Sequence, residues 1–166
     1  RILASFAVII AIMLLMVVVS YSRLLKIETS QEAVRDDAVP GVYLSSMIRS
    51  AWVDSYLLTV DIIGLREDKT LTGSDKADYR TFDARIEQQM AGYEKTIHGQ
   101  ADRMEFDNFK ASHINYNKAL AEVLERIEAK DLPAARVLLD EQLTPAWTAG
   151  RMKLNDIITS NKGVSD

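Results

Sequence analysis

The stretch Leu44–Leu65, LSSMIRSAWVDSYLLTVDIIGL, determines the fold that we expect. Apolar or small side chains recur in it at alternating spacings of four and three residues, which is the heptad pattern of a helix packed along a seam. The members of this seam are Leu44, Ile48, Ala51, Ser55, Leu58, Ile62 and Leu65. We therefore expect one long helix over 22–66. Its one interruption is Pro40–Gly41, where proline is expected to kink the helix rather than end it.

Three further helices are predicted downstream. A polar break over 71–75 precedes the second helix, which His98–Gly99 ends because glycine accepts the left-handed conformation after a helix. Asp102, with Glu105 three residues on, resembles a capping box that starts the third helix. Asp131 is expected to be the N-cap of the fourth helix, with Pro133 in its first turn and Pro145 as a bend. The apolar stripes of the three helices are Tyr79, Phe82, Ile86, Met90, Tyr93 and Ile97; Phe106, Phe109, His113, Tyr116, Leu120, Leu124 and Ile127; and Leu132, Ala135, Leu139, Leu143, Ala146, Leu154, Ile157 and Ile158.

The predicted fold class is all-α, an antiparallel up-down-up-down four-helix bundle. No segment shows the strict alternation of a strand, and short links between long helices favour antiparallel neighbours. The fourth helix then returns to the end of the bundle from which the first one starts. This return predicts that a second membrane helix follows beyond Asp166.

An apolar N-terminal run predicts that the bundle is attached to a membrane. Residues 2–19 carry no charge, and at ~1.5 Å per residue such a helix spans ~27 Å, close to the hydrocarbon thickness of a bilayer. A cleaved signal peptide is the alternative, but no small-residue cleavage site precedes Arg23. We expect a transmembrane helix over 1–21, which the bundle continues, and a sensor domain over 22–166. The flanking charges do not decide the orientation.

Composition excludes several functions. The chain has no cysteine and a net charge of −4, so it offers no thiolate metal site and no basic stripe for nucleic acid. Its two histidines, His98 and His113, are far apart in sequence and are interpreted as ordinary helix residues rather than as a metal-ligand pair. It has no phosphate-binding glycine loop. We expect neither an enzyme nor a bound cofactor or metal.

A second stripe on the first helix marks a candidate ligand site. It holds charged, aromatic and hydroxyl side chains beside the apolar seam, and comprises Ser45, Arg49, Trp52, Tyr56, Thr59 and Ile63. Matching levels along antiparallel helices at ~1.5 Å per residue sets Val53 near Gln88, Tyr116 and Thr144–Pro145. The predicted ligand-binding residues are Arg49, Trp52, Tyr56, Arg85, Tyr116, Thr144, Trp147 and Arg151.

The chemistry of this stripe suits a carboxylate. A guanidinium group gives paired, charge-assisted hydrogen bonds to a carboxylate, and neighbouring aromatic rings exclude water from them. The alternative is that Arg49 extends into solvent along its own stem while the aromatic side chains fill the core. Both interpretations remain open for Arg49, and packing is favoured for the residues of the other three helices.

The sequence resembles a known family at three places: Val39–Pro40 followed by 43–49 (YLSSMIR), residues 128–135 (EAKDLPAA), and residues 143–147 (LTPAW). Together with the N-terminal anchor and the four helices, they resemble the four-helix-bundle sensor domain of bacterial methyl-accepting chemotaxis receptors. The resemblance implies a sensor in the periplasm on the inner membrane. It also implies a homodimer through the first helix, and a returning helix that transmits ligand binding to cytoplasmic kinase-coupling domains absent here. Relatives that sense aspartate or serine hold them with several arginines on this helix.

Three functions compete at this stage. Arg49 is the only arginine between Arg35 and Arg66, which favours a small organic acid over an amino acid as the ligand of a chemoreceptor. The same sensor fold also serves sensor histidine kinases and cyclases. A membrane-anchored helical scaffold without a small ligand is the third possibility. Apolar side chains off the seam, such as Tyr43, Leu57 and Val60, favour a homodimer through the first helix.

Overall fold

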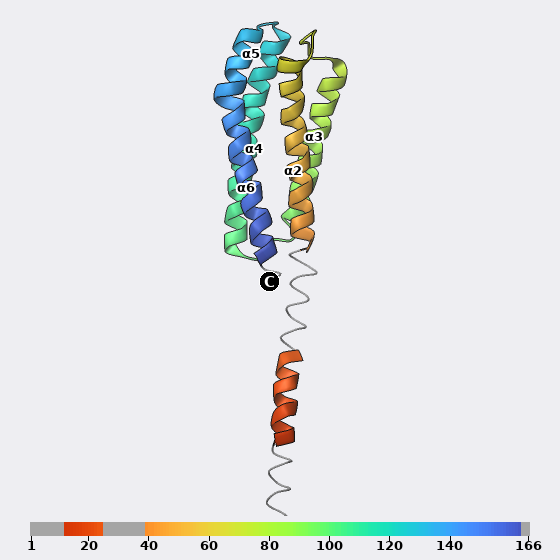
Figure 1. Cartoon of the computed structure of the whole chain (residues 1–166), viewed down its shortest axis with the longest axis vertical. Helices are drawn as coiled ribbons and strands as arrows, with labels where there is room; N and C mark the ends of the chain where they lie inside the picture. Colours follow the sequence, from red (N-terminus) through yellow and green to blue (C-terminus); the bar gives the residue numbers. More distant parts are fainter. Residues whose placement is uncertain (1–11, 25–38, 164–166) are drawn as a thin grey trace, which may run out of the picture.

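A computed structural model describes residues 12–24 and 39–163 of the chain. Within these ranges every regular element is a helix, and Figure 1 shows long helices running side by side as a bundle. Residues 12–24 are also helical, and their apolar side chains are exposed. The described part of the chain contains no helix that combines the length and the apolar character needed to cross a bilayer. The predicted span over 1–21 lies largely outside the described residues.

The first helix of the bundle is α2 (Val39–Val60), which the π-helical segment η2 (Asp61–Leu65) extends. Pro40 lies in the first turn of α2, where a missing N–H costs no hydrogen bond. The expected kink of a longer helix at Pro40 concerns residues before Val39 and lies outside the described residues.

The heptad seam is buried along most of α2 but fails at its end. Ile48, Ala51 and Ser55 are buried, whereas Leu65 is 77% exposed. A π-helical turn contains more residues than an α-helical one, so η2 rotates the later positions. Ile62 and Ile63 are consequently both buried and Leu65 turns outward. The prediction that Leu65 belongs to the seam was therefore wrong.

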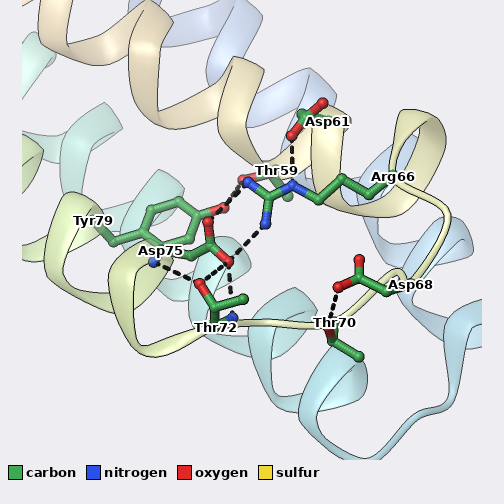
Figure 2. A network of polar contacts seen from close by, with 8 residues as sticks. All are labelled: Thr59, Asp61, Arg66, Asp68, Thr70, Thr72, Asp75 and Tyr79. Carbon is green, nitrogen blue, oxygen red and sulfur yellow. Dashed lines mark hydrogen bonds and ion pairs between the residues drawn. The ribbon is translucent and has the colours of Figure 1, made fainter.

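A polar network joins the end of α2 to the start of α3 (Gly73–Tyr93), and Figure 2 shows it. Thr72 and Asp75 form a capping box at the N-terminus of α3. The Arg66 guanidinium donates to both carboxylate oxygens of Asp75, at 2.7 and 2.8 Å, and to Asp61 at 2.7 Å. Hydrogen bonds from Arg66 hold the pKa of Asp75 well below its usual range, although burial opposes them. The break predicted over 71–75 is thus a helix start in which Asp75 already belongs to the first turn.

The link between α3 and α4 (Gln100–Glu128) differs from the prediction at both ends. α3 ends at Tyr93, five residues before His98. Gly99 is the N-cap of α4 and makes no side-chain capping bond. The Asp102 carboxylate instead accepts a hydrogen bond from the Tyr93 hydroxyl at 2.6 Å. The capping box expected from Asp102 and Glu105 was wrong, because this contact across the link takes the carboxylate.

The fourth helix of the bundle has three consecutive parts: α5 (Leu132–Leu138), the π-helical segment η3 (Leu139–Leu143) and α6 (Thr144–Gly163). Asp131 caps α5, as predicted, because its carboxylate accepts a hydrogen bond from the Ala134 N–H at 3.2 Å. The helix changes its winding at η3, directly before Pro145, where a bend was predicted.

The predicted fold class is confirmed: the described residues form an all-α bundle of four long antiparallel helices. α2 lies against α3 and α6, and α4 lies against α6, as Figure 1 shows. The backbones of α3 and α4 approach one another less closely than these pairs. The core is rich in aromatic rings, and its largest fully buried side chains are Trp52, Tyr93, Phe106, Phe109 and Tyr116.

Candidate ligand-binding site

Aromatic and hydroxyl side chains join α2 to α6 midway along the bundle. The Trp52 indole N–H donates to the backbone carbonyl of Trp147 at 3.1 Å. The Tyr56 ring stacks on the Trp147 ring, with 4.3 Å between centroids, and the hydroxyls of Tyr56 and Thr144 are hydrogen-bonded at 3.0 Å. We call Tyr56, Thr144, Trp147 and Arg151 the α2–α6 cluster. The structure therefore brings together four of the predicted site residues, and Trp52 lies directly beneath them.

Trp52 itself is completely buried, so in this structure it supports the cluster from the core side. Its ring packs on Tyr116 of α4, with 4.4 Å between centroids. The Tyr116 hydroxyl is in turn hydrogen-bonded to Ser55 at 2.9 Å. Burial raises the pKa of Tyr116 above its ordinary value, although the hydrogen bond with Ser55 acts in the opposite direction. Tyr116 thus links α4 to the α2–α6 cluster from within the core.

Two hydrogen-bond donors in the α2–α6 cluster lack a partner. The Arg151 guanidinium lies over the Trp147 ring, 4.6 Å from its centroid, in a cation–π contact. The Trp147 Nε1 and Arg151 Nε atoms are shielded from solvent, and neither has a hydrogen-bond partner among the residues that the structure describes. Buried donors in folded proteins are nearly always paired. Two unpaired donors on side chains that touch each other therefore indicate a place for a hydrogen-bond acceptor. An anionic oxygen would satisfy them best, because one donor is cationic.

Arg49 lies at the same level as Arg151 but points to a different surface. The contacts of Trp52 with Trp147 and of Tyr56 with Thr144 fix the antiparallel register, which sets Arg49 opposite Arg151. The Arg49 side chain is exposed and lines a shallow surface depression of about 370 Å³. The other lining residues are Ser46, Ser50, Val53 and Asp54. This depression belongs to the outer face of α2.

Arg85, like Arg49, has no contact within the described part of the chain that connects it to the other predicted site residues. It lies half-buried on α3, and among the described residues it makes no hydrogen bond or ion pair. α3 contacts α2 on the side away from α6.

Sequence reasoning missed one residue that shapes the site. Gly150 on α6 is buried against Trp52, and a Cβ atom added there would lie 2.3 Å from Cζ2 of the indole. A glycine at this position lets α6 approach Trp52 closely. The signal was available, because Gly150 falls one turn after Ala146 and one turn before Leu154, on the apolar stripe of the fourth helix.

The fold and the α2–α6 cluster define a helical bundle whose first and last helices are held side by side by aromatic contacts. In a comparison with protein-family models, residues 1–166 match the family described as a four helix bundle sensory module for signal transduction. The chain therefore belongs to this family, which confirms the resemblance to the sensor domain of methyl-accepting chemotaxis proteins. No curated protein and no solved structure matched the chain.

Proposed function

We propose that this sensory module is the periplasmic sensor domain of an inner-membrane chemoreceptor, and that its ligand is a small organic carboxylic acid. The observation that carries the ligand class is the pair of unpaired, shielded donors on Trp147 and Arg151. A carboxylate accepts two hydrogen bonds side by side and carries the charge that a guanidinium group prefers. The neighbouring hydroxyls of Tyr56 and Thr144 add orientation.

The position of the α2–α6 cluster suits signalling. Tyr56 belongs to α2, whereas Thr144, Trp147 and Arg151 belong to α6, the helix that runs to the C-terminal end of the bundle. A ligand can change an equilibrium between two helix positions only through contacts that differ between them. A carboxylate held between α2 and α6 supplies such contacts. Small helix displacements of this kind are an established means of transmitting binding.

The outer face of α2 supports dimerisation. Val39, Tyr43 and Leu57 are 60%, 62% and 55% exposed, although the opposite face of the same helix lies in the core. A second copy of α2 would cover this apolar face around a two-fold axis. The same face carries Arg49, so a dimer would enclose the depression beside it. We propose a homodimer through α2.

A binding screen with charge variants tests the ligand class. The full chain in detergent micelles is titrated calorimetrically with aliphatic and aromatic acids, amino acids and sugars. We expect a carboxylic acid to bind, and Arg151→Gln to weaken it about 10- to 100-fold, because one charge-assisted hydrogen bond is lost. Glutamine keeps much of the side chain's stem over Trp147. Arg136→Gln, an exposed arginine on α5, is the matched control and should bind as the wild type does.

Each alternative outcome has a distinct meaning. A carboxylate could bind Arg151→Gln and Arg136→Gln with equal affinity and fail to bind Arg49→Gln. That result would place the ligand site on the outer face of α2. Binding of sugars or amino acids alone would contradict the carboxylate proposal. No binding by any compound would favour a scaffold without a small ligand.

A further inference from the structure

A buried histidine on α4 faces two carboxylates on α3. The Nε2 atom of His113 lies 3.3 Å from Oδ1 of Asp83, and its Nδ1 atom lies 3.5 Å from Oε1 of Glu87. Asp83 and Glu87 are four residues apart, so both carboxylates lie on one face of α3. The three side chains each offer one ligand atom, and these atoms all lie within 4.8 Å of one another. The sequence alone predicts only an ordinary helix residue at His113.

The surroundings of His113 hold its ring in place. The side chain is 4% exposed, and its ring lies nearly parallel to that of Phe109 and 5.7 Å from that of Trp52. Burial lowers the pKa of His113 below its ordinary value, although Asp83 and Glu87 act in the opposite direction. Imidazole nitrogen is the commonest side-chain ligand of transition-metal ions in proteins. The two carboxylates are exposed, so an ion has access from solvent.

The charges at this face are unbalanced. Among the described residues, neither Asp83 nor Glu87 forms an ion pair with lysine or arginine. Like charges at this spacing on a helix repel one another. Asn117, one turn after His113, donates to Asp83 at 3.0 Å and lies 3.2 Å from the His113 Nε2 atom. The face therefore holds two carboxylates, an imidazole and an amide, with no cationic side chain paired to them.

We propose that Asp83, Glu87 and His113 bind a divalent transition-metal ion of the zinc class between α3 and α4. One imidazole nitrogen and two carboxylate oxygens form a donor set that Zn²⁺ accepts, with water in the remaining position. Ligand atoms of a tetrahedral zinc ion lie about 3.4 Å apart, given bonds of ~2.0–2.2 Å. The ligand atoms lie within 4.8 Å of one another here, so binding requires them to move closer together, and the two carboxylates are the exposed members of the set. Asn117 is a positioning residue beside the ligands.

Such an ion would connect two neighbouring helices whose backbones are not in close contact. α3 and α4 are held further apart than the other adjacent pairs, and the three ligands come from both. The His113 ring also contacts Trp52, the residue beneath the α2–α6 cluster. The metal site is independent of the proposed carboxylate ligand, since the two share no residue.

Cobalt and zinc binding to the full chain tests the proposal. The chain is purified without a histidine tag in detergent micelles and titrated with CoCl₂, followed by visible absorption, and with ZnCl₂, followed by calorimetry. We expect one ion per chain and a visible cobalt band. The variants His113→Gln and Asp83→Asn/Glu87→Gln should each lose the band. The double variant changes exposed side chains only, so it remains informative if His113→Gln does not fold.

The second histidine supplies the matched control. His98→Gln removes the only other imidazole of the chain, at an exposed position, and should bind metal as the wild type does. Asn117→Ala should weaken zinc binding about 10- to 100-fold, as changes next to metal ligands typically do. Two results would overturn the proposal: wild-type chain that binds neither ion, or equal binding by the wild type and the Asp83→Asn/Glu87→Gln variant.

Discussion

Gly150→Ala is expected to lower the free energy of unfolding of the bundle by about 3 kcal/mol, the upper part of the range for overpacked cores. The added Cβ atom would lie 2.3 Å from Cζ2 and 2.8 Å from Cη2 of Trp52. Trp52 has little freedom to move, because it is completely buried, bonded to the Trp147 carbonyl and packed on Tyr116. The strain therefore has to separate α2 from α6. Chemical denaturation of the full chain, followed by circular dichroism, measures the loss.

Gly64→Ala is the matched control for this prediction. No atom lies within 4 Å of a Cβ atom added to Gly64 in η2, so alanine should leave stability unchanged or raise it by up to ~1 kcal/mol. A double variant tests the mechanism, since Trp52→Phe removes the part of the indole that the new methyl group meets. We expect Gly150→Ala to cost less in the Trp52→Phe background than alone. Equal costs in both backgrounds would show that Trp52 is not the obstacle.

The features that could be predicted from sequence depend on local periodicity. Helical stripes such as Phe106, Phe109 and Tyr116 are buried as expected, because one apolar face must point to the core whatever the neighbours are. The N-cap at Asp131 depends on its own carboxylate and the next three residues. Level-matching at a constant rise set Val53 beside Thr144–Pro145, but the α2 residue that bonds to Thr144 is Tyr56, three positions further along the helix.

The features that could not be predicted depend on contacts between distant residues or on changes of helical winding. Leu65 leaves the seam because η2 is π-helical, and no heptad pattern signals that change. Asp102 bonds to Tyr93 rather than capping its own helix. The approach of His113 to Asp83 and Glu87 depends on how α3 and α4 are rotated about their axes. Two pairs at a spacing of four, Asp83 with Glu87 and His113 with Asn117, were nevertheless visible in the sequence.

Asp75→Ala is expected to destabilise the bundle by about 2–3 kcal/mol, because it removes charge-assisted hydrogen bonds from Arg66, whose side chain is 27% exposed, together with the capping box of α3. The Asp75 side chain is 5% exposed, and its carboxylate accepts from Arg66, from the Thr72 hydroxyl and from the Thr72 N–H. Alanine at this position leaves part of the Arg66 guanidinium group without a partner. It also opens the capping box of α3, because the Thr72 N–H loses its hydrogen bond to the Asp75 carboxylate. Asp68→Ala is the matched control, because Asp68 is exposed and, within the described part of the chain, accepts only from Thr70. It should change stability by less than ~0.5 kcal/mol.

The pH dependence of unfolding separates the charge of Asp75 from its packing. The folded-state pKa of Asp75 lies well below its usual range because Arg66 donates to it. In the unfolded chain the pKa of an aspartate is about 3.9. The ion pair therefore contributes its full stability above about pH 5, and that contribution falls as pH decreases towards the folded-state pKa. The wild type should lose more stability than Asp75→Ala between about pH 5 and pH 2. Equal losses in the two proteins would mean that the Asp75 carboxylate contributes through shape alone.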